Sequence, residues 1–519
     1  MPPDAPAANG STPSAAHELE HLDVLVIGAG LSGIGAGWYL QDRCPWASYA
    51  IFEARDAIGG TWDLFRYPGI RSDSDMFTLG YSFRPWDGEK TIADGESILR
   101  YIEDTARVFG IDRKIRFHHK VVAAEWSTDD ARWLVTAERT DTGERFQLTA
   151  GFLFSCTGYY RYDHGYEPEF PGRDRFQGTI VHPQHWPEDL DYAGKRIVVI
   201  GSGATAVTLV PSLAETAAHV TMLQRSPTYV VSMPERNPLA ELLRRTLPER
   251  AGSTAIRWML ALGTQASYFA SQRWPRFMRK VLRKGVERQL PPGYDVDTHF
   301  NPSYDPWDQR LCAVPDGDLF KAIRDGRASV VTDHIDTFTE TGIRLRSGEE
   351  LEADVIVTAT GLELLFLGGI ELTVDGEPVD VANRLAYKGM MLEGVPNAAL
   401  AIGYTNASWT LKCDLTCDYV TRLLNHLRAT GLRQATPRNH DPSISPEPLL
   451  GLQSGYITRA ADRFPKQGTR HPWRVYQSYL ADYRSLKRSP VVDEALELSN
   501  PAPVAADRHR APAPASAGR

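Results

Sequence analysis

Two glycine-rich turns, each lying between an apolar run and a helical pattern of small residues, constrain the fold of this chain more than any other feature. The first turn contains Gly28, Gly30 and Gly33 and follows the apolar residues 22–27. A buried parallel strand has such a largely apolar sequence, and these glycines let the backbone approach a pyrophosphate at a helix N-terminus. The first turn therefore predicts a dinucleotide site.

An acidic residue lies at the end of the next predicted strand. The run SYAIFEA, residues 48–54, is typical of a buried strand and ends near Glu53. A carboxylate at this distance from the glycine turn binds the diol of a ribose. Glycine turn and acid together make a chance glycine cluster a poor explanation, and they favour FAD as the ligand of this first site.

The second glycine turn follows the predicted strand 196–200 and contains Gly201, Gly203 and Ala206. Its matching second strand, HVTMLQ, is followed by Arg225 rather than by an acid. A guanidinium binds a ribose 2′-phosphate through paired charge-assisted hydrogen bonds, whereas a carboxylate repels it. The second site therefore suits NADPH over NADH. The alternative explanation of Arg225 is a solvent-exposed charge at the end of a strand.

Two apolar strands that end in Thr-Gly, at Thr157-Gly158 and Thr360-Gly361, indicate where the chain passes between the two nucleotide units. They predict a split FAD domain with the NADPH domain inserted into it. The sequence thus predicts an α/β fold with two Rossmann-like dinucleotide-binding domains, for FAD and NADPH, and a helical insertion. The predicted boundaries are a disordered leader at 1–20, the FAD domain at 21–160 and 361–490, the NADPH domain at 161–236 and 301–360, the helical insertion at 237–300, and a disordered tail at 491–519.

Composition excludes several other classes. The formal net charge of −8 does not favour a nucleic-acid partner. Five cysteines without CxxC spacing indicate a reducing compartment and hence a cytoplasmic protein. No apolar run is long enough to span a membrane, and the first twenty residues do not resemble a signal peptide. Cys413 and Cys417 would share one helix face, but no second Cys/His pair lies nearby, so we predict packing and no metal site.

A longer motif points to a family. The segment FQGTIVHPQHWP resembles the fingerprint of the Baeyer-Villiger monooxygenases, a group within the class B flavoprotein monooxygenases, with Phe176, Gly178, His182, Trp186 and Pro187 at its fixed positions. The segments at 59–86, 301–323 and 402–415 extend the resemblance, which covers residues 22–486. The resemblance is to the branch that includes the mycobacterial ethionamide-activating monooxygenase. This resemblance implies that the protein uses FAD and NADPH as cofactors and dioxygen as a co-substrate.

The resemblance also implies roles for particular residues. Arg310 would stabilise an anionic peroxyflavin, and Asp73 would be its electrostatic partner as well as a cofactor-binding residue. Thr61 and Trp62, in the segment GGTWDLFRYPG, would contact the flavin cofactor. In the cyclic-ketone branch a lysine precedes the catalytic arginine and helps to hold the NADPH phosphate.

In this chain Gln309 stands in place of that lysine. The phosphate would then rest mainly on Arg225 and Ser226, which makes nicotinamide binding a firmer expectation than the preference for NADPH. His182 is the titratable member of the fingerprint, but it lies in a connection between domains. We therefore expect a hinge or orienting role for His182 rather than a catalytic one.

Residues 237–290 lack strand patterns and contain helical runs, which in the family cover the NADPH domain and contribute to the substrate entrance. The second run is basic around Trp274 and Phe277. A solvated helix face is the favoured explanation, and a weak peripheral contact with an anionic membrane is the alternative. The basic residues of this run are Arg273, Arg276, Arg279, Lys280, Arg283, Lys284 and Arg288.

The leading functional hypothesis is an FAD-dependent, NADPH-consuming monooxygenase that inserts one oxygen atom next to a ketone carbonyl to give an ester or lactone. The alternative is a flavin monooxygenase that oxidises sulfur or nitrogen atoms, so the substrate is a small ketone or sulfide. An electron-transfer flavoprotein or reductase of the disulfide type is disfavoured, because no redox cysteine pair follows either glycine turn.

Overall fold

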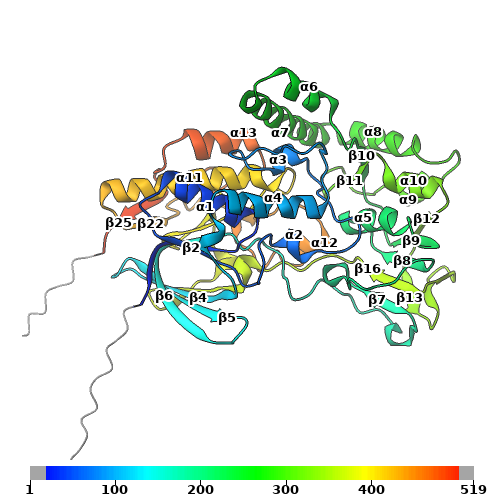
Figure 1. Cartoon of the computed structure of the whole chain (residues 1–519), viewed down its shortest axis with the longest axis horizontal. Helices are drawn as coiled ribbons and strands as arrows, with labels where there is room; N and C mark the ends of the chain where they lie inside the picture. Colours follow the sequence, from blue (N-terminus) through cyan, green and yellow to red (C-terminus); the bar gives the residue numbers. More distant parts are fainter. Residues whose placement is uncertain (1–18, 502–519) are drawn as a thin grey trace, which may run out of the picture.

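Two sheets lying side by side organise the computed structural model, which describes residues 19–501 (Figure 1). The first sheet has the strand order β18-β17-β4-β5-β6-β1-β2-β3, with β21 also paired to β6. Its strands β1, β2, β6 and β21 run parallel, whereas β4, β5 and β6 form an antiparallel meander. The strands are β1 His21–Ile27, β2 Tyr49–Phe52, β3 Ile115–Arg116, β4 His119–Ser127, β5 Arg132–Arg139, β6 Arg145–Ser155, β17 Glu371–Val374, β18 Glu377–Pro378 and β21 Ala398–Leu400.

The second sheet is wholly parallel, with the order β12-β9-β8-β16-β7. Its strands are β7 Thr179–Val181, β8 Arg196–Ile200, β9 His219–Gln224, β12 Ala328–Thr332 and β16 Val355–Thr358. A small antiparallel sheet accompanies it, formed by β13 Ile335–Phe338, β14 Gly342–Leu345 and β15 Glu350–Glu352. β17 and β21 return to the first sheet after the second sheet is complete. The nucleotide unit built on the second sheet (the second unit) is therefore inserted into the one built on the first sheet (the first unit). The predicted α/β fold class is confirmed.

Helices cover both sheets. Those of the first unit are α1 Leu31–Arg43, α2 Thr61–Leu64, α3 Met76–Leu79, α4 Gly95–Val108, α11 Trp409–Thr430, α12 Gly455–Thr458 and α13 Tyr479–Asp482. Those of the second unit are α5 Ala204–Leu213, α9 Val296–His299 and α10 Asp318–Arg324. Short two-stranded sheets join β10 Val230–Met233 to β11 Cys312–Pro315, β19 Ala386–Tyr387 to β20 Met391–Leu392, and β23 Pro446–Pro448 to β24 Lys466–Gly468.

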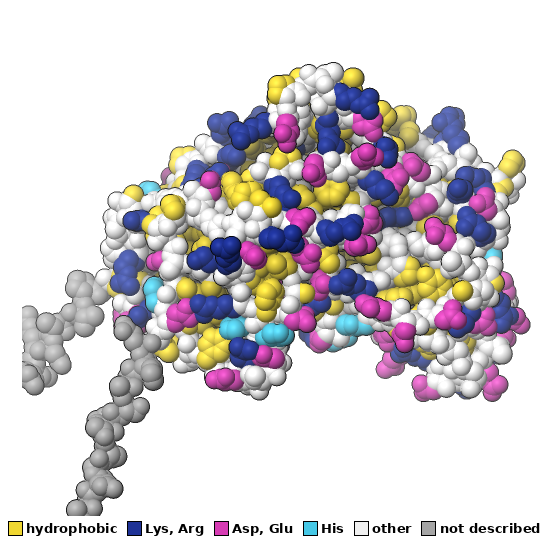
Figure 2. Space-filling view, viewed as in Figure 1, with side chains coloured by type: hydrophobic (Ala, Val, Ile, Leu, Met, Phe, Trp, Pro, Cys, Tyr) yellow, Lys and Arg dark blue, Asp and Glu magenta, His cyan; other side chains and the backbone are white. Residues whose placement is uncertain are grey.

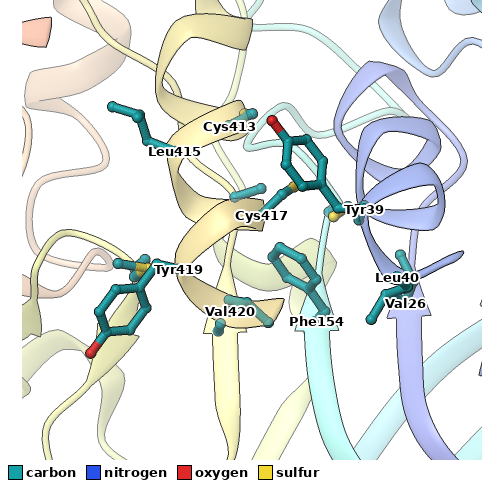
Figure 3. Close-up of a cluster of buried hydrophobic side chains, with 14 of the residues drawn as sticks. Val26, Tyr39, Leu40, Phe154, Cys413, Leu415, Cys417, Tyr419 and Val420 are labelled. Atoms are coloured by element: carbon teal, nitrogen blue, oxygen red, sulfur yellow. The ribbon is translucent and has the colours of Figure 1, made fainter. Parts of the chain in front are cut away.

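The main core of the first unit lies between its sheet and the helices α1 and α11. Figure 3 shows Val26 and Phe154 from β1 and β6 facing side chains of these helices. Cys413 and Cys417 lie on one side of α11 within this core, as their spacing predicts, and the Sγ atom of Cys413 is 3.3 Å from the Oγ atom of Ser32. Both cysteines therefore serve the packing of α11.

Three helices, α6 Pro238–Thr246, α7 Glu249–Arg273 and α8 Pro275–Glu287, form a layer at the upper edge of the molecule in Figure 1. Arg257 of α7 attaches this layer to the first unit. Its guanidinium donates to the carbonyl oxygen of Gly80 at 2.6 Å and to the carboxylate of Asp414 on α11 at 2.8 Å. Both side chains are about one-tenth exposed, so the contact is a buried anchor.

The predicted C-terminal tail begins too early. β25, Leu496–Ser499, pairs antiparallel with β22, Gln434–Pro437, and Leu496 is buried in the main core. Pairing with β22 and burial of Leu496 stabilise this segment, although its neighbours have the composition of a tail. The predicted leader, apart from residues 19–20, and the tail beyond residue 501 lie outside the described residues. Among the described helices, none is long and apolar enough to cross a membrane.

Candidate functional site

The first glycine turn joins β1 to α1 and is built so that no side chain fits at two of its glycines. Gly28 has φ of +103°, and a Cβ there would lie 2.6 Å from the carbonyl oxygen of Cys156. A Cβ on Gly33 would lie 1.8 Å from the carbonyl oxygen of Gly28. Gly30, at the N-cap of α1, has no atom closer than 3.6 Å to its Cβ position. The turn thus lacks a side chain beside a helix N-terminus, which lets a pyrophosphate approach the backbone.

Glu53 lies one residue beyond β2 and faces this turn. Its carboxylate accepts hydrogen bonds from the backbone N–H groups of Ala29 at 2.7 Å and Arg55 at 2.9 Å. The side chain is buried, and desolvation raises the pKa of Glu53 above its usual value. The first glycine turn and the N-terminus of α1 are called the first cradle below, and the corresponding turn before α5 the second cradle. The backbone contacts hold the carboxylate of Glu53 beside the first cradle, where the sequence predicts a ribose contact.

Thr61 and Trp62 lie at the start of α2, next to the same turn. The backbone of Gly59 pairs with Gly30, and its N–H donates to the carbonyl oxygen of Ala29 at 3.1 Å. The hydroxyl of Thr61 is 3.4 Å from that of Tyr162, and Trp62 packs half-buried against the main core. The structure therefore places Thr61 and Trp62 next to the first cradle.

The second glycine turn joins β8 to α5. Gly201 has φ of +139°, and a Cβ there would lie 2.3 Å from the carbonyl oxygen of Ala359. Gly203, the N-cap of α5, has no atom within 4 Å of its Cβ position, and Ala206 is fully buried. Like the first turn, this one presents an open helix N-terminus to an anion.

Arg225 and Ser226 directly follow β9 and are exposed at the carboxyl edge of the second sheet. Within residues 19–501, Arg225 makes no ion pair or side-chain hydrogen bond. The hydroxyl of Ser202, in the glycine turn, donates to the carbonyl oxygen of Ser226 at 3.2 Å and so ties the two segments together. The guanidinium of Arg225 is therefore available to an anion beside the second cradle.

A second arginine near this cradle was missed by the sequence analysis. Arg459, at the end of α12, lies with its guanidinium 3.5 Å from the ring centroid of Tyr166 and donates to the carbonyl oxygen of Leu362. Burial lowers the pKa of Arg459, and the positive charge of Arg225 acts in the same direction. The sequence held no signal for this proximity, because α12 belongs to the C-terminal part of the chain.

Arg310 and Asp73 meet as the family resemblance implies. Two guanidinium nitrogens of Arg310 each lie 2.9 Å from an oxygen of the Asp73 carboxylate, which makes the pair bidentate. The carboxylate raises the pKa of Arg310 above its ordinary value, so the guanidinium stays charged. Asp73 precedes α3 and Arg310 precedes β11, so the pair joins segments of both nucleotide units.

Three tyrosines surround this arginine, and the sequence analysis did not single them out. Tyr159, Tyr160 and Tyr456 are each close enough for their charge state to interact with that of Arg310. Burial raises the pKa of all three phenols, so they stay protonated at neutral pH. Tyr159 and Tyr160 directly follow the first Thr-Gly strand end, a position that is a usable signal, whereas Tyr456 comes from α12.

The fingerprint segment packs along the second sheet. Phe176 is buried, and a Cβ on Gly178 would lie 2.5 Å from the carbonyl oxygen of Asp354. Trp186 packs against the core of the second unit, whereas Pro187 is exposed. His182 follows β7, and its Nδ1 atom accepts a hydrogen bond from the backbone N–H of Gln184 at 3.2 Å. With the exception of His182, the fingerprint residues therefore form a connecting segment along the second sheet.

His182 also borders a small hollow that residues of both units line. Its Nε2 atom and the Oε1 atom of Gln184 are buried and find no hydrogen-bond partner within the described part of the chain. Burial lowers the pKa of His182, so its imidazole is neutral at pH 7. Such polar atoms fit a polar ligand that reaches in from the second cradle. The hollow is lined by Phe65, Tyr67, His182, Pro183, Gln184, Thr205, Ala359, Gly361 and Leu362.

Comparison with known proteins agrees with this geometry. A family model described as "Flavin-binding monooxygenase-like" matches residues 81–402, and one described as "NAD(P)-binding Rossmann-like domain" matches residues 26–85. The chain is 58% identical over 487 residues to the FAD-containing monooxygenase EthA of Mycobacterium tuberculosis, which covers 93% of this chain and 99% of the relative.

Two solved structures share the fold. An oxidised steroid monooxygenase bound to NADP matches with a TM-score of 0.74 at 23% identity, covering 92% of this chain and all of that one. The cyclohexanone monooxygenase of Rhodococcus sp. Phi1 bound to NADP+ matches with a TM-score of 0.69 at 20% identity, covering 93% of this chain and all of that one. The expected flavoprotein monooxygenase class is confirmed, and the chain belongs to the flavin-binding monooxygenase-like family.

Proposed function

We propose that this enzyme is an FAD-dependent, NADPH-consuming monooxygenase of the Baeyer-Villiger type, which converts a ketone and dioxygen into an ester or lactone. The bidentate Arg310–Asp73 pair carries the proposal. An arginine held by one carboxylate across two nucleotide units, among protonated phenols, provides a fixed positive charge for an anionic oxygen-transfer step. The family membership sets the general chemistry, and the arginine pair favours this version of it.

FAD is assigned to the first cradle. The open helix N-terminus at Gly30 would hold the pyrophosphate, Glu53 the ribose diol, and the segment of Thr61 and Trp62 the neighbouring part of the cofactor. The relative EthA is named as FAD-containing, which supports this assignment. When bound and reduced, FAD supplies the activation of dioxygen.

NADPH is assigned to the second cradle. The N-terminus of α5 at Gly203 would hold the pyrophosphate, and Arg225 with Ser226 the 2′-phosphate. Arg459 adds a second positive charge near Arg225 and takes over part of the role that a lysine at the position of Gln309 has in the cyclic-ketone branch. The solved relatives bound to NADP support this assignment.

The protein's own residues would act by charge and by exclusion of water. Arg310 stabilises negative charge during oxygen transfer, and Asp73 fixes the guanidinium in one orientation. The aromatic side chains of Tyr159, Tyr160 and Tyr456 limit the access of water to the arginine, whose side chain is 28% exposed. His182, neutral and with a buried Nε2 atom that finds no partner among the described residues, would orient a polar group of the nicotinamide cofactor.

Oxidation of sulfur or nitrogen is the second candidate, and one observation favours it. The three buried phenols stay neutral near Arg310, so their O–H groups can donate hydrogen bonds to a transferred oxygen that is in protonated form. The two candidates differ in which substrates react and in their dependence on Arg310.

A product survey tests the proposal. The purified enzyme is incubated with NADPH, dioxygen and matched panels of ketones and sulfides, and the products are identified by mass together with the NADPH consumed. We expect esters in proportion to NADPH loss. Sulfoxides without any ester would reject the Baeyer-Villiger assignment in favour of the second candidate, and NADPH loss without either product would reject both.

A further inference from the structure

The exposed apolar side chains of this protein are concentrated on the helical layer α6–α8. Within residues 19–501, only Leu19, Val108 and Tyr476 of the large exposed hydrophobic residues lie elsewhere. The others, all between α6 and α8, are Leu239, Leu242, Leu247, Leu262, Phe269, Trp274, Phe277 and Val281. Single exposed apolar residues are ordinary on a protein surface, but this concentration on one layer indicates an interaction face.

The spacing of these residues places them on helix faces. On α8 and its N-cap, Trp274, Phe277 and Val281 are three and four residues apart and are 58%, 62% and 46% exposed. On α7, Leu262 and Phe269 are two turns apart and are 43% and 50% exposed. Moving such an exposed aromatic side chain from water into an interface lowers the free energy.

Unpaired basic residues lie among these apolar side chains. The structure pairs Arg279 with Asp305, and Arg283 with Asp297 and Glu287. The other cations of residues 273–288 make no ion pair within residues 19–501, although the chain as a whole has a net charge of −8. Figure 2 shows Lys, Arg and hydrophobic side chains along the upper edge, over this layer, with some Asp and Glu side chains among them. The unpaired cations are Arg273, Arg276, Lys280, Lys284 and Arg288.

From these observations we propose that α6–α8 is a docking face for an anionic phospholipid membrane, on which the enzyme lies as a peripheral protein. Exposed Trp and Phe insert at the headgroup level, while flexible Lys and Arg side chains meet the lipid phosphates. The sequence alone favoured a solvated helix face, and the exposure of Trp274 and Phe277 adds two large aromatic side chains to that face. The buried Arg257–Asp414 anchor holds the layer on the body, so the face is fixed before binding.

Vesicle sedimentation tests this proposal with the full-length enzyme containing its flavin. The vesicles consist of phosphatidylcholine alone or of equal parts phosphatidylcholine and phosphatidylglycerol. We expect binding to the anionic vesicles, much weaker binding to the neutral ones, and release at high salt, since salt screens the phosphate contacts. The readout needs no turnover, so it is independent of the proposed reaction.

Paired variants identify the face. Trp274→Ala with Phe277→Ala should lower the partition coefficient about tenfold or more, because two aromatic side chains no longer enter the interface. The matched control, Val108→Ala with Tyr476→Ala, removes two exposed apolar side chains elsewhere and should bind as the parent does. Flavin content and circular dichroism confirm that each variant is folded.

A second set of variants tests the positive charge of the face. Lys280→Glu with Lys284→Glu should abolish binding to the anionic vesicles, whereas Lys114→Glu with Lys120→Glu, an equal charge change at exposed positions away from the layer, should reduce it far less. Failure of the parent enzyme to bind anionic vesicles would overturn the proposal, as would equal losses in the variants and their controls. A dimer in solution that dissociates in the Trp274→Ala/Phe277→Ala variant would also overturn it, because a second copy of the chain would then occupy the face.

Discussion

Arg310 is held by both oxygens of the Asp73 carboxylate, at 2.9 Å each, although the two residues lie in different nucleotide units. A bidentate contact fixes the plane of the guanidinium as well as its position. The orientation of the proposed catalytic charge therefore depends on how the two units pack, so movement between the units would move the charge.

Replacing this arginine should separate oxygen transfer from flavin binding. We expect Arg310→Ala to keep FAD but to form little or no ester, and to divert the electrons of NADPH to hydrogen peroxide. Arg310→Lys should restore little, because a point charge on a flexible stem lacks the planar fork. Ester yield and peroxide release per NADPH measure the effect. A normal ester yield in Arg310→Ala would remove this residue from the mechanism.

Asp73→Ala should weaken the same reaction less than Arg310→Ala does. The carboxylate orients the guanidinium but is not assigned the charge that stabilises oxygen transfer. We expect a partial loss of ester with a matching rise in peroxide, measured in the same coupled assay. If Asp73→Ala instead lost all ester while peroxide stayed low, the carboxylate would act before oxygen transfer, at flavin reduction.

Gly30→Val should give a folded protein without FAD. The Cβ position at Gly30 has no atom closer than 3.6 Å, so the turn tolerates a first side-chain atom, but a branched side chain fills the space assigned to the pyrophosphate. Gly33→Val is the contrasting variant and should fail to fold, because its Cβ would lie 1.8 Å from a carbonyl oxygen. Absorbance spectra and circular dichroism distinguish the two. A fully flavin-loaded Gly30→Val protein would refute the assignment of FAD to the first cradle.

Arg225→Ala should weaken NADPH binding by about 1.5–3 kcal/mol, the scale of a hydrogen bond to a charged group, and leave NADH nearly unaffected. Arg459→Ala should have a smaller effect of the same selectivity. Coenzyme titrations of both variants, with the exposed Arg346→Ala as control, provide the comparison. Equal losses for NADPH and NADH would mean that neither arginine contacts the 2′-phosphate.

The buried anchor of the helical layer should matter for stability. Asp414→Ala leaves Arg257 buried without its carboxylate, a change that costs about 3–5 kcal/mol. The exposed pair Arg100–Glu96, with a separation of 3.0 Å, serves as the control, since Glu96→Ala should cost at most about 1 kcal/mol. Urea midpoints measure both. Similar midpoints for the two variants would show that the contact at α7 contributes little.

Local patterns predicted the two cradles well. Gly28 and Gly201 have the positive φ that a tight turn requires, and β1 and β8 are the apolar runs that precede them. Turn geometry and apolar runs are visible in short segments, so the sequence of each segment is sufficient to predict them. The tail was predicted wrongly for the opposite reason, because β25 is stabilised by an edge of β22 that its own sequence does not reveal.

The sequence by itself determined the α/β class and the positions of both glycine turns, because strand, turn and helix signals are local. Only the tertiary structure decided that Arg459 lies near Arg225, that Tyr456 lies near Arg310, and that Trp274 and Phe277 are exposed. These three relationships depend on how distant segments pack. Packing free energy is shared among many contacts across the chain, so no single segment encodes it.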